Sequence, residues 1–207
     1  MDIPDCFLDV RVFGTLYGVS AVAIGFAIRR LKNLMDEKHI PLIGVVSAFV
    51  FAAQMLNFPV AGGTSGHFMG GVLSAILLGP SAGVLIMTTV LVVQCFVFQD
   101  GGLTAIGANI FNMGIIGSVG GYYIYAALRK FFKIPISAFI ASWLSIVVAS
   151  SFCAVELAVS GTVPLKVSLI AMASVHALIG IGEGLITVAV LGFISKARPD
   201  LNDIIKN

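Results

Sequence analysis

The sequence predicts an all-α integral membrane bundle, and both its composition and its apolar runs support that class. Of 207 residues, 58% are hydrophobic and only 11% are charged, and the mean hydropathy is +1.06. An ordinary soluble domain carries about 25% charged residues, so this chain lacks the charge to remain in water. Its apolar runs approach the length of a membrane-spanning helix, whereas the strands of a membrane barrel are much shorter. We therefore expect a helical membrane protein without a separate soluble domain.

Seven apolar segments, separated by polar or glycine-rich connectors, are the predicted spans. Arg29 and Arg30 end the first segment, and Gly79-Pro80-Ser81 separates the third from the fourth. Proline lacks a backbone donor and fixes its own φ, which favours a turn there. We treat residues 1–207 as one transmembrane domain with a tail at residues 1–10. The spans are expected at residues 12–28, 40–60, 68–78, 82–98, 103–128, 135–159 and 167–194.

The basic residues predict the orientation of these spans. If the connector after the first span is cytoplasmic, ten Lys and Arg residues lie on the cytoplasmic side and only Arg11 and Lys166 lie outside. This positive-inside bias places the N-terminus outside and the C-terminus in the cytoplasm of a multi-pass plasma-membrane protein. It also gathers residues 1–10, 61–67, 99–102 and 160–166 on the outer face. The ten cytoplasmic residues are Arg29, Arg30, Lys32, Lys38, Arg129, Lys130, Lys133, Lys196, Arg198 and Lys206.

The acidic tail and one loop histidine together suggest a metal site. The tail begins MDIPDC and lacks the cationic start of a signal peptide, so we expect a free amine near Asp2. One metal ion can be bound in fused chelate rings by that amine, the next amide nitrogen and the side chain of Asp2. Ni(II) and Cu(II) prefer planar coordination of this kind. His67 ends a glycine-rich loop on the same side. For the tail, the alternative is a solvated acidic segment, and for His67 it is an interfacial histidine bonded to a loop carbonyl. Cys6 is either a soft ligand nearby or an incidental thiol.

Polar residues within the predicted spans are further candidates. His176 and Glu183 are seven residues apart and share a helix face, and Glu156 lies in the preceding span. Ionisable groups in a membrane usually point into the bundle, where they bind ligand, relay protons or form a structural hydrogen bond. Asn109 and Asn112 are amides of the kind that join membrane helices.

Other patterns limit the possible functions. Ala48 and Ala52 are four apart, which suits either packing within the bundle or docking of another membrane subunit. The net charge of +2 does not indicate nucleic-acid binding, and three widely spaced cysteines form neither a disulfide framework nor a zinc site. The sequence contains no H-E-x-x-H motif and no phosphate-binding loop, so active transport would need a separate motor.

Several segments together resemble a known family. They are Met1 to Asp5, Gly62 to His67, Leu78 to Pro80, Phe98 to Gly102, Gly107 to Met113 and His176 to Glu183. In this order they resemble the substrate-specific (S) component of energy-coupling factor importers for cobalt and nickel, the CbiM/NikM family. The resemblance implies partners: a transmembrane coupling subunit, two ATPases and often a small accessory membrane subunit. It also makes Ala48 and Ala52 candidates for the coupling-subunit contact.

The resemblance further implies a site for the transported ion, with no resident cofactor. In the family the ion is held by the first amine, the amide nitrogen and side chain of residue 2, and the loop histidine. These positions are Met1, Asp2 and His67 here, with Asn109, Asn112, His176 and Glu183 as supporting residues. The family has histidine at position 2, so Asp2 puts affinity and metal choice in question, and Cys6 replaces a usual glycine.

We therefore predict a non-enzymatic component that captures divalent cobalt or nickel outside the cell. One rival is an intramembrane metalloenzyme that uses His67, His176 and Glu183, although these residues show no recognised catalytic spacing. A second rival is a paralogue that has been retuned to another metal, or has lost metal binding and still assembles with the motor.

Overall fold

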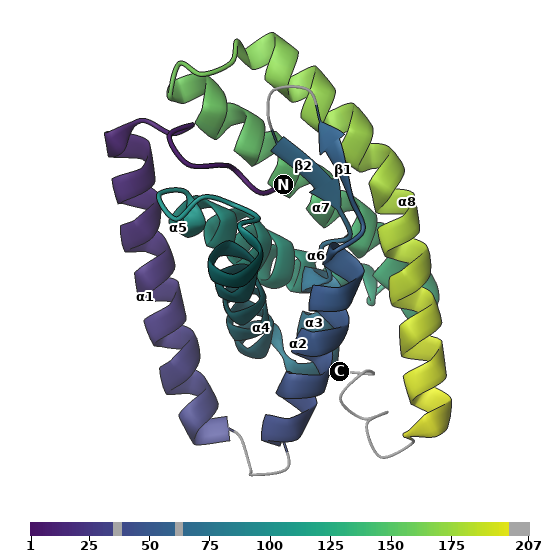
Figure 1. Cartoon of the computed structure of the whole chain (residues 1–207). Coiled ribbons are helices and arrows are strands. Elements are labelled where there is room, and N and C mark those ends of the chain that lie inside the picture. The colour runs from purple at the N-terminus through teal and green to yellow at the C-terminus, as the bar shows by residue number, and fades with distance from the viewer. Residues whose placement is uncertain (35–38, 61–63, 199–207) are drawn as a thin grey trace.

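The structure, a computed structural model, describes residues 1–34, 39–60 and 64–198, and it is mostly helical (Figure 1). This confirms the predicted α-helical class. The elements, in which η marks a π-helical segment, are α1 (Val10–Leu34), α2 (His39–Gln54), β1 (Asn57–Val60), β2 (Thr64–His67), α3 (Gly71–Leu78), α4 (Pro80–Val93), η1 (Gln94–Phe98), α5 (Ile106–Ile110), η2 (Phe111–Gly120), α6 (Gly121–Leu128), α7 (Ile134–Val159) and α8 (Leu165–Ala197).

Four helical stretches in the described part of the chain are long and apolar enough to cross a membrane. They are Val10–Asn33, Pro80–Phe98, Ile134–Val159 and Leu165–Ala197, and a shorter apolar helix covers Ile40–Gln54. Large apolar side chains such as Phe26, Leu178 and Phe193 lie on their outer surfaces, more than half exposed. In water such surfaces would be costly, whereas lipid accepts them. The chain is therefore a membrane-integral protein.

The helix predicted at residues 103–128 begins slightly later, at Ile106. The backbone stays helical through η2 to Leu128. At the two junctions, Ile110 has φ −66° and ψ −40°, and Gly120 has φ −58° and ψ −48°, which are both helical values. Insertions of π-helix in an α-helix are found mostly at functional sites. Here η2 packs against α3, α4 and α7, and so forms part of the interior.

The helix predicted to run to residue 60 ends early, and that part of the prediction is wrong. α2 stops at Gln54, and Asn57–Val60 pairs antiparallel with Thr64–His67 as a two-stranded hairpin. Pro59 explains the break, because proline cannot continue a helix and disfavours helical geometry in the residue before it. The predicted turn at residues 79–81 is also shorter than expected. Only Gly79, with φ +87°, interrupts the helices, and Pro80 is the first residue of α4.

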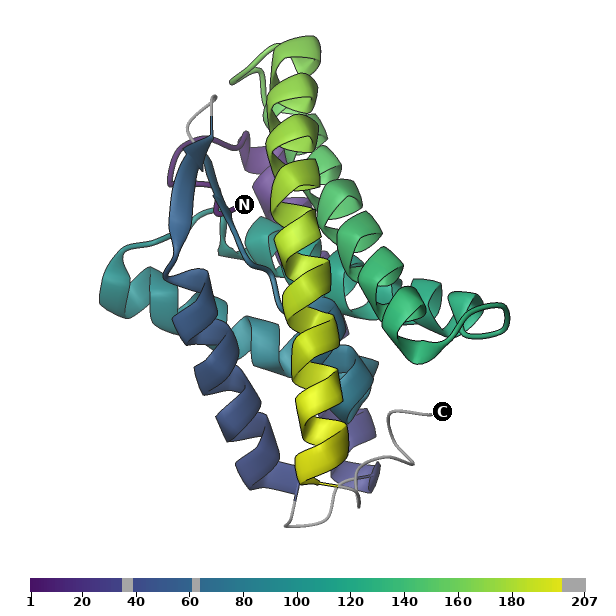
Figure 2. The same ribbon diagram turned by 90° about the vertical axis from the view of Figure 1, so that its right-hand side faces the viewer.

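The centre of the bundle is the eight-residue helix α3, in which Gly71 to Leu77 are all buried. It contacts α4, η2, α6, α7 and α8. Helices α7 and α8 pack along each other as the most extensive helix pair, and the hairpin lies beside α8 (Figure 2). Helix α1 packs on α4, α5 and η2 from the other side.

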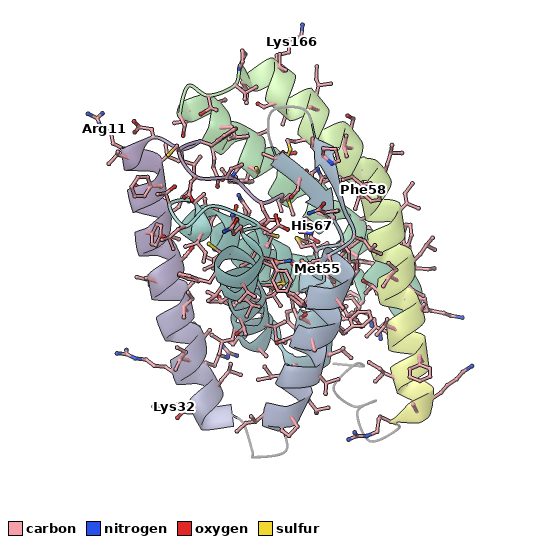
Figure 3. The ribbon with its side chains drawn as sticks, in the orientation of Figure 1. Arg11, Lys32, Met55, Phe58, His67 and Lys166 are labelled. Carbon is pink, nitrogen blue, oxygen red and sulfur yellow. The ribbon has the colours of Figure 1, made fainter. Side chains whose placement is uncertain are left out.

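The N-terminal tail, the hairpin and the α7–α8 connection gather at one end of the bundle, called the tail end below (Figure 1). Arg11 and Lys166 lie at this end, and Lys32 lies at the opposite end (Figure 3). Of the segments expected on one face, residues 1–10, 64–67, 99–102 and 160–166 contribute to this end, and residues 61–63 lie outside the described part of the chain. Thr162 Oγ1 donates a hydrogen bond to the carbonyl of Phe7, and Gly102 N donates to the carbonyl of Ile3.

Candidate metal centre

The first three residues run inward from the tail end and are buried. Met1 and Ile3 have no exposed surface, and Asp2 is 3% exposed. The backbone of Ile3 is held on both sides: its N–H donates to Asn109 Oδ1 at 2.9 Å, and its carbonyl accepts from Gly102 N at 2.8 Å. Asn109 Nδ2 also reaches that carbonyl at 3.3 Å. The side-chain amide of Asn109 thus takes the place of a neighbouring strand and fixes the tail in the bundle.

The turn before α5 fits closely against the tail. A Cβ on Gly102 would lie 2.2 Å from Asp5 N and 2.5 Å from the carbonyl carbon of Pro4, so only glycine allows this approach. The carboxylate of Asp5 accepts hydrogen bonds from the backbone N–H and the hydroxyl of Thr104, both at 2.7 Å. These bonds from Thr104 hold the pKa of Asp5 below its ordinary value.

The hairpin brings His67 to the buried end of the tail. In its register Asn57 lies opposite His67, and Val60 lies opposite Thr64. A Cβ on Gly66 would lie 2.7 Å from Ile179 Cδ1 and 3.1 Å from Val60 Cγ2, so this glycine lets the strand lie directly on α8. Side chains alternate along a strand, so Ser65 and His67 share one face. That face points toward Met1, and His67 is seen inside the bundle next to the hairpin (Figure 3).

His67 is oriented by the residue that follows it. Its Nδ1 lies 2.7 Å from the carbonyl oxygen of Phe68. A carbonyl can only accept, so Nδ1 carries a proton and Nε2 faces the tail. The next two backbone N–H groups, of Met69 and Gly70, donate to the two carboxylate oxygens of Glu183 at 2.7 and 2.8 Å. Glu183 therefore satisfies donors at the N-terminus of α3 and ties the histidine strand to α8.

Three potential metal donors converge at this point. His67 Nε2 lies 2.6 Å from Asp2 Oδ2 and 3.2 Å from the Met1 amine, and the amine lies 3.9 Å from Asp2 Oδ2. All three residues are buried. In the described residues no group of three His, Cys, Asp or Glu side chains could hold a metal ion. The cluster is instead built from two side chains and a backbone amine.

Ser65 links the members of the cluster. Its Oγ lies 3.1 Å from the Met1 amine, accepts from Asp2 N at 3.2 Å and donates to Asp2 Oδ2 at 3.1 Å. The Met1 amine also donates to the carbonyl oxygen of Ser65. Ser65 is not among the ligands or supporting residues predicted from the sequence. Its position two residues before His67 is the signal that could have found it, because such residues share a strand face.

The charges of the cluster balance each other. Burial lowers the pKa of the Met1 amine from its ordinary value, an effect that the neighbouring charge of Asp2 only partly opposes. Burial alone would raise the pKa of Asp2. However, the interactions with His67, the amine and Ser65 outweigh burial and hold that pKa well below its ordinary range. Asp2 is therefore a carboxylate and the amine readily loses its proton, as metal coordination by both groups requires.

The other predicted polar residues are buried near the cluster but outside it. Asn112 Nδ2 donates to Glu156 Oε2 at 2.7 Å, which joins η2 to α7. His176 Nδ1 lies 2.8 Å from the carbonyl of Met172, one turn earlier in α8. The pairing of His176 with Glu183 considered from their spacing does not occur, since both oxygens of Glu183 accept from Met69 and Gly70, while Nε2 of His176 is buried without a hydrogen-bond partner. His67, His176 and Glu183 likewise do not form a joint metal-binding group among the described residues.

The cysteines differ from expectation. Cys6 is exposed, and its backbone N–H donates to Thr104 Oγ1 at 3.3 Å, so its thiol is not part of the buried cluster. Cys153 is fully buried, with its Sγ 3.9 Å from the carbonyl oxygen of Met1. No pattern in the sequence marks Cys153 as a neighbour of the tail, because the two residues are 152 positions apart.

Ala48 and Ala52 lie on α2 and take part in none of the contacts described above. Both are exposed, and their side chains are small. Gly44, one turn earlier on the same face, has no atom within 4 Å of where a Cβ would stand. The three residues form a flat exposed stripe.

A mostly helical bundle with apolar outer surfaces that buries an amine, a carboxylate and an imidazole together belongs to the class of integral membrane proteins with a polar site inside the bundle. Sequence comparison makes this specific: the family described as the CbiM cobalt uptake substrate-specific transmembrane region matches residues 2–201. The chain belongs to this family, which confirms the predicted resemblance. It is a cobalt and nickel uptake transmembrane component of the CbiM type.

Relatives and a solved structure agree with this assignment. A protein of Archaeoglobus fulgidus, assigned as a fused nickel transport protein NikMN, is 47% identical over 97% of this chain and 68% of its own length. A cobalt transport protein CbiM of Sorangium cellulosum is 32% identical over 88% of this chain and 84% of its own. The crystal structure of a transition metal transporter superposes with a TM-score of 0.90 at 31% identity, covering 95% of this chain and 93% of that one.

Proposed function

We propose that this chain is the substrate-binding S component of an energy-coupling factor importer for divalent cobalt or nickel, with Met1, Asp2 and His67 as ligands of the transported ion. The observation that carries the proposal is the convergence of the Met1 amine, Asp2 Oδ2 and His67 Nε2 in one buried cluster. The names of the relatives as nickel and cobalt transport proteins support the choice of cargo.

The distances within the cluster suit an ion with square-planar coordination. With bonds of about 2.0 Å, neighbouring donors of a square stand about 2.8 Å apart and opposite donors about 4.0 Å apart. Here His67 Nε2 is 2.6 and 3.2 Å from the other two donors, which are 3.9 Å from each other. The amine and Asp2 Oδ2 would then be opposite corners, and the amide nitrogen of Asp2 would complete the square opposite His67.

The cargo ion would take the place of protons. The proton on Nδ1 of His67 points to the carbonyl of Phe68, so it does not account for the short contact between Nε2 and Asp2 Oδ2. Two acceptors this close need a second proton between them, and the ion would displace that proton. The amine and the amide nitrogen of Asp2 would each lose one further proton. Ser65, which now accepts from that amide, would turn its hydroxyl to donate to the nitrogen. Loading therefore releases protons, as metal binding by such ligands generally does.

We infer a seven-span topology with the tail end outside the cell. Arg11 and Lys166 at the tail end, and Lys32 at the other, are consistent with the positive-inside rule (Figure 3). At a rise of about 1.5 Å per residue, α3 by itself covers only about 12 Å, less than half of a bilayer core. In this topology β2, which is largely buried, and α3 together make the third crossing, so the non-helical backbone of β2 lies in protein.

The partners follow from the same proposal. A coupling subunit, two ATPases and a small accessory subunit would form the complete importer, and ATP hydrolysis would reorient this chain toward the cytoplasm. The exposed stripe of Gly44, Ala48 and Ala52 is the proposed contact with the coupling subunit, because small residues let membrane helices approach closely.

Calorimetry of Co²⁺ and Ni²⁺ on the purified protein tests the proposal. His67→Ala removes one donor, and we expect a loss of affinity of at least about 100-fold, because even outer partners of metal ligands are worth 10–100-fold. His39→Ala, at the start of α2, is the matched control and should bind like the wild type. A short extension before Met1 should also abolish binding, because it converts the amine to an amide.

The two rivals give different results in this experiment. A paralogue that has lost metal binding would show no heat with either ion in the wild-type protein. A chain retuned to a harder ion would bind Mn²⁺ or Zn²⁺ more tightly than Ni²⁺, and would still depend on His67. An unchanged affinity in His67→Ala would reject the proposed ligand set.

A further inference from the structure

A cavity of about 400 Å³ lies directly above the cluster at the tail end. It is enclosed by the tail, the hairpin and the turn after η1. Its lining is rich in oxygen atoms, from three carboxylates and several amide and hydroxyl groups, and no Lys or Arg among the described residues lines it. The polar lining residues that matter below are Asp2, Asp5, Asn57, Ser65, Gln99 and Asp100.

The carboxylates of the cavity are graded in exposure. Asp5 is exposed, Asp100 is intermediate and Asp2 is 3% exposed, so they mark a path from the surface to the cluster. Asp5 is occupied by Thr104, and one oxygen of Asp100 accepts from Asn57 Nδ2 at 3.3 Å. Burial, together with the nearby charge of Asp2, raises the pKa of Asp100.

The decisive feature is the second oxygen of Asp2. Oδ2 belongs to the cluster, but Oδ1 is buried and has no hydrogen-bond partner. It lies on the side of Gly101, a lining residue of the cavity, since a Cβ there would be 3.6 Å from it. An unpaired buried carboxylate oxygen is costly unless something positively charged reaches it. Asp2 thus has one oxygen in the cluster and one on the cavity side.

We propose that this cavity is an outer cation site, in which Asp100 and Asp2 Oδ1 receive the hydrated divalent ion before it enters the cluster. The inference rests on the proposed function, and it adds a site that precedes the ligands themselves. Its occupant is a hexahydrated ion bound through water, because the three carboxylates are not close enough together to chelate a bare metal.

The volume and the cluster geometry both fit a hydrated ion. Six waters at about 30 Å³ each occupy about 180 Å³, which the cavity accommodates. The cluster does not accommodate them, because its donors are 2.6 to 3.9 Å apart and buried. The ion must therefore exchange water for protein donors at the boundary, and Asp2 lies there. Four of the six metal–water bonds would be replaced by bonds to the amine, the amide nitrogen, Asp2 and His67, and the other two waters would leave as the ion becomes square-planar.

Hexaamminecobalt(III) is a suitable probe, because it has about the size of a hexahydrated divalent ion, carries one more positive charge and does not exchange its ligands. It can occupy the outer site but cannot enter the cluster. We expect it to bind the purified wild-type protein and to slow Co²⁺ entry in stopped-flow measurements. Asp100→Asn should weaken its binding and lower the Co²⁺ association rate by about tenfold at low salt, as for a charged cleft that focuses a cation. Asp100→Glu should restore both.

Controls separate the outer site from general charge and from folding. Asp9→Asn removes one charge from an exposed residue at the tail end that does not line the cavity, and should change neither quantity. The final Co²⁺ occupancy of Asp100→Asn, measured at saturation, shows that its cluster is intact. High salt should reduce the difference between wild type and Asp100→Asn, because screening weakens attraction beyond about 10 Å at 0.1 M.

The result that overturns the inference is hexaamminecobalt that fails to bind, or binds Asp100→Asn as well as the wild type. Failure of the proposed function is a different observation. It would appear as Co²⁺ binding that is absent or indifferent to His67→Ala.

Discussion

At the scale of single residues, Asp2 is the most informative position. Its side chain accepts from Ser65, contacts His67 and leaves one oxygen unpaired. A carboxylate in this position would supply a hard oxygen where the family resemblance implies an imidazole nitrogen. Ni(II) favours nitrogen donors in planar geometry, whereas oxygen donors shift the preference toward harder ions. Residue 2 is therefore expected to set metal choice, while Met1 and His67 provide the common part of the site.

Replacing Asp2 by histidine tests this role. Asp2→His should raise the affinity for Ni²⁺ by about tenfold or more, which corresponds to about 1.4 kcal/mol per factor of ten. The affinity for Mn²⁺ should fall in the same variant. Competition calorimetry with the two ions measures the change, and Asp9→His, at an exposed tail position that does not line the cavity, is the control. Equal gains for both ions would show that residue 2 does not select the metal.

The pH dependence of binding follows from the pKa shifts of the tail. The pKa of the Met1 amine is lowered from an ordinary value of 8.0, so the free tail binds more protons than the docked tail as pH falls from there. The pKa of Asp2 is also lowered, from an ordinary value of 3.8, so docking loses stability again in strong acid. Both effects have the same sign, and docking and metal affinity should rise with pH.

Titration of Ni²⁺ affinity between pH 5 and pH 9 measures this dependence. We expect a continuous decrease in affinity toward acid, with protons released on binding at neutral pH. Buffers of different ionisation enthalpy report the number of protons released in calorimetry. An affinity that is flat over this range would contradict a role for the amine.

At the scale of elements, the sequence predicts the long helices well because each needs only a run of apolar residues. It does not predict the hairpin, because Asn57 to Val60 is as apolar as the helix before it and only Pro59 signals the change. The pairing of Asn109 with Ile3 and of Asn112 with Glu156 depends on tertiary packing over 106 and 44 positions, for which a single sequence carries no pattern. The inward path of the tail came from the family resemblance alone.

The hydrogen bonds from Met69 and Gly70 to Glu183 make α3 depend on α8. Glu183→Gln replaces one acceptor oxygen by a donor and leaves one buried N–H unsatisfied, which should destabilise the protein by about 1–3 kcal/mol. His67 is three residues before Gly70, so Co²⁺ affinity should fall as well. Thermal unfolding in detergent and calorimetry measure the two effects.

Ser174→Ala, on an exposed position of α8, is the control for this change. It should stay within about 0.5 kcal/mol of the wild type, as surface substitutions usually do. A Glu183→Gln protein as stable as the control would show that the carboxylate is not an anchor for α3.

At the scale of the whole molecule, the tail end holds the cluster and its cavity, and α2 exposes a stripe of small residues. Nothing in the described part of the chain covers Gly44, Ala48 and Ala52, whereas the cluster is complete without a partner. Capture of the ion and assembly with the motor should therefore be separable by mutation.

The double substitution Ala48→Leu and Ala52→Leu tests this separation. Two leucine side chains would keep a partner helix from close approach, so co-purification with the coupling subunit should fall strongly while Co²⁺ affinity stays unchanged. Ala21→Leu, on an exposed face of α1, is the matched control and should assemble normally. Loss of Co²⁺ binding in the double variant would show that α2 supports the cluster instead.

The contact between Met1 and Cys153 has a consequence for biosynthesis. The two residues are 152 positions apart, so the part of the tail's docking surface that α7 forms is made only after most of the chain has been synthesised. The contacts of the tail with His67 and Asn109 involve earlier parts of the chain. Docking of the amine end is therefore completed late in biosynthesis, when α7 is in place.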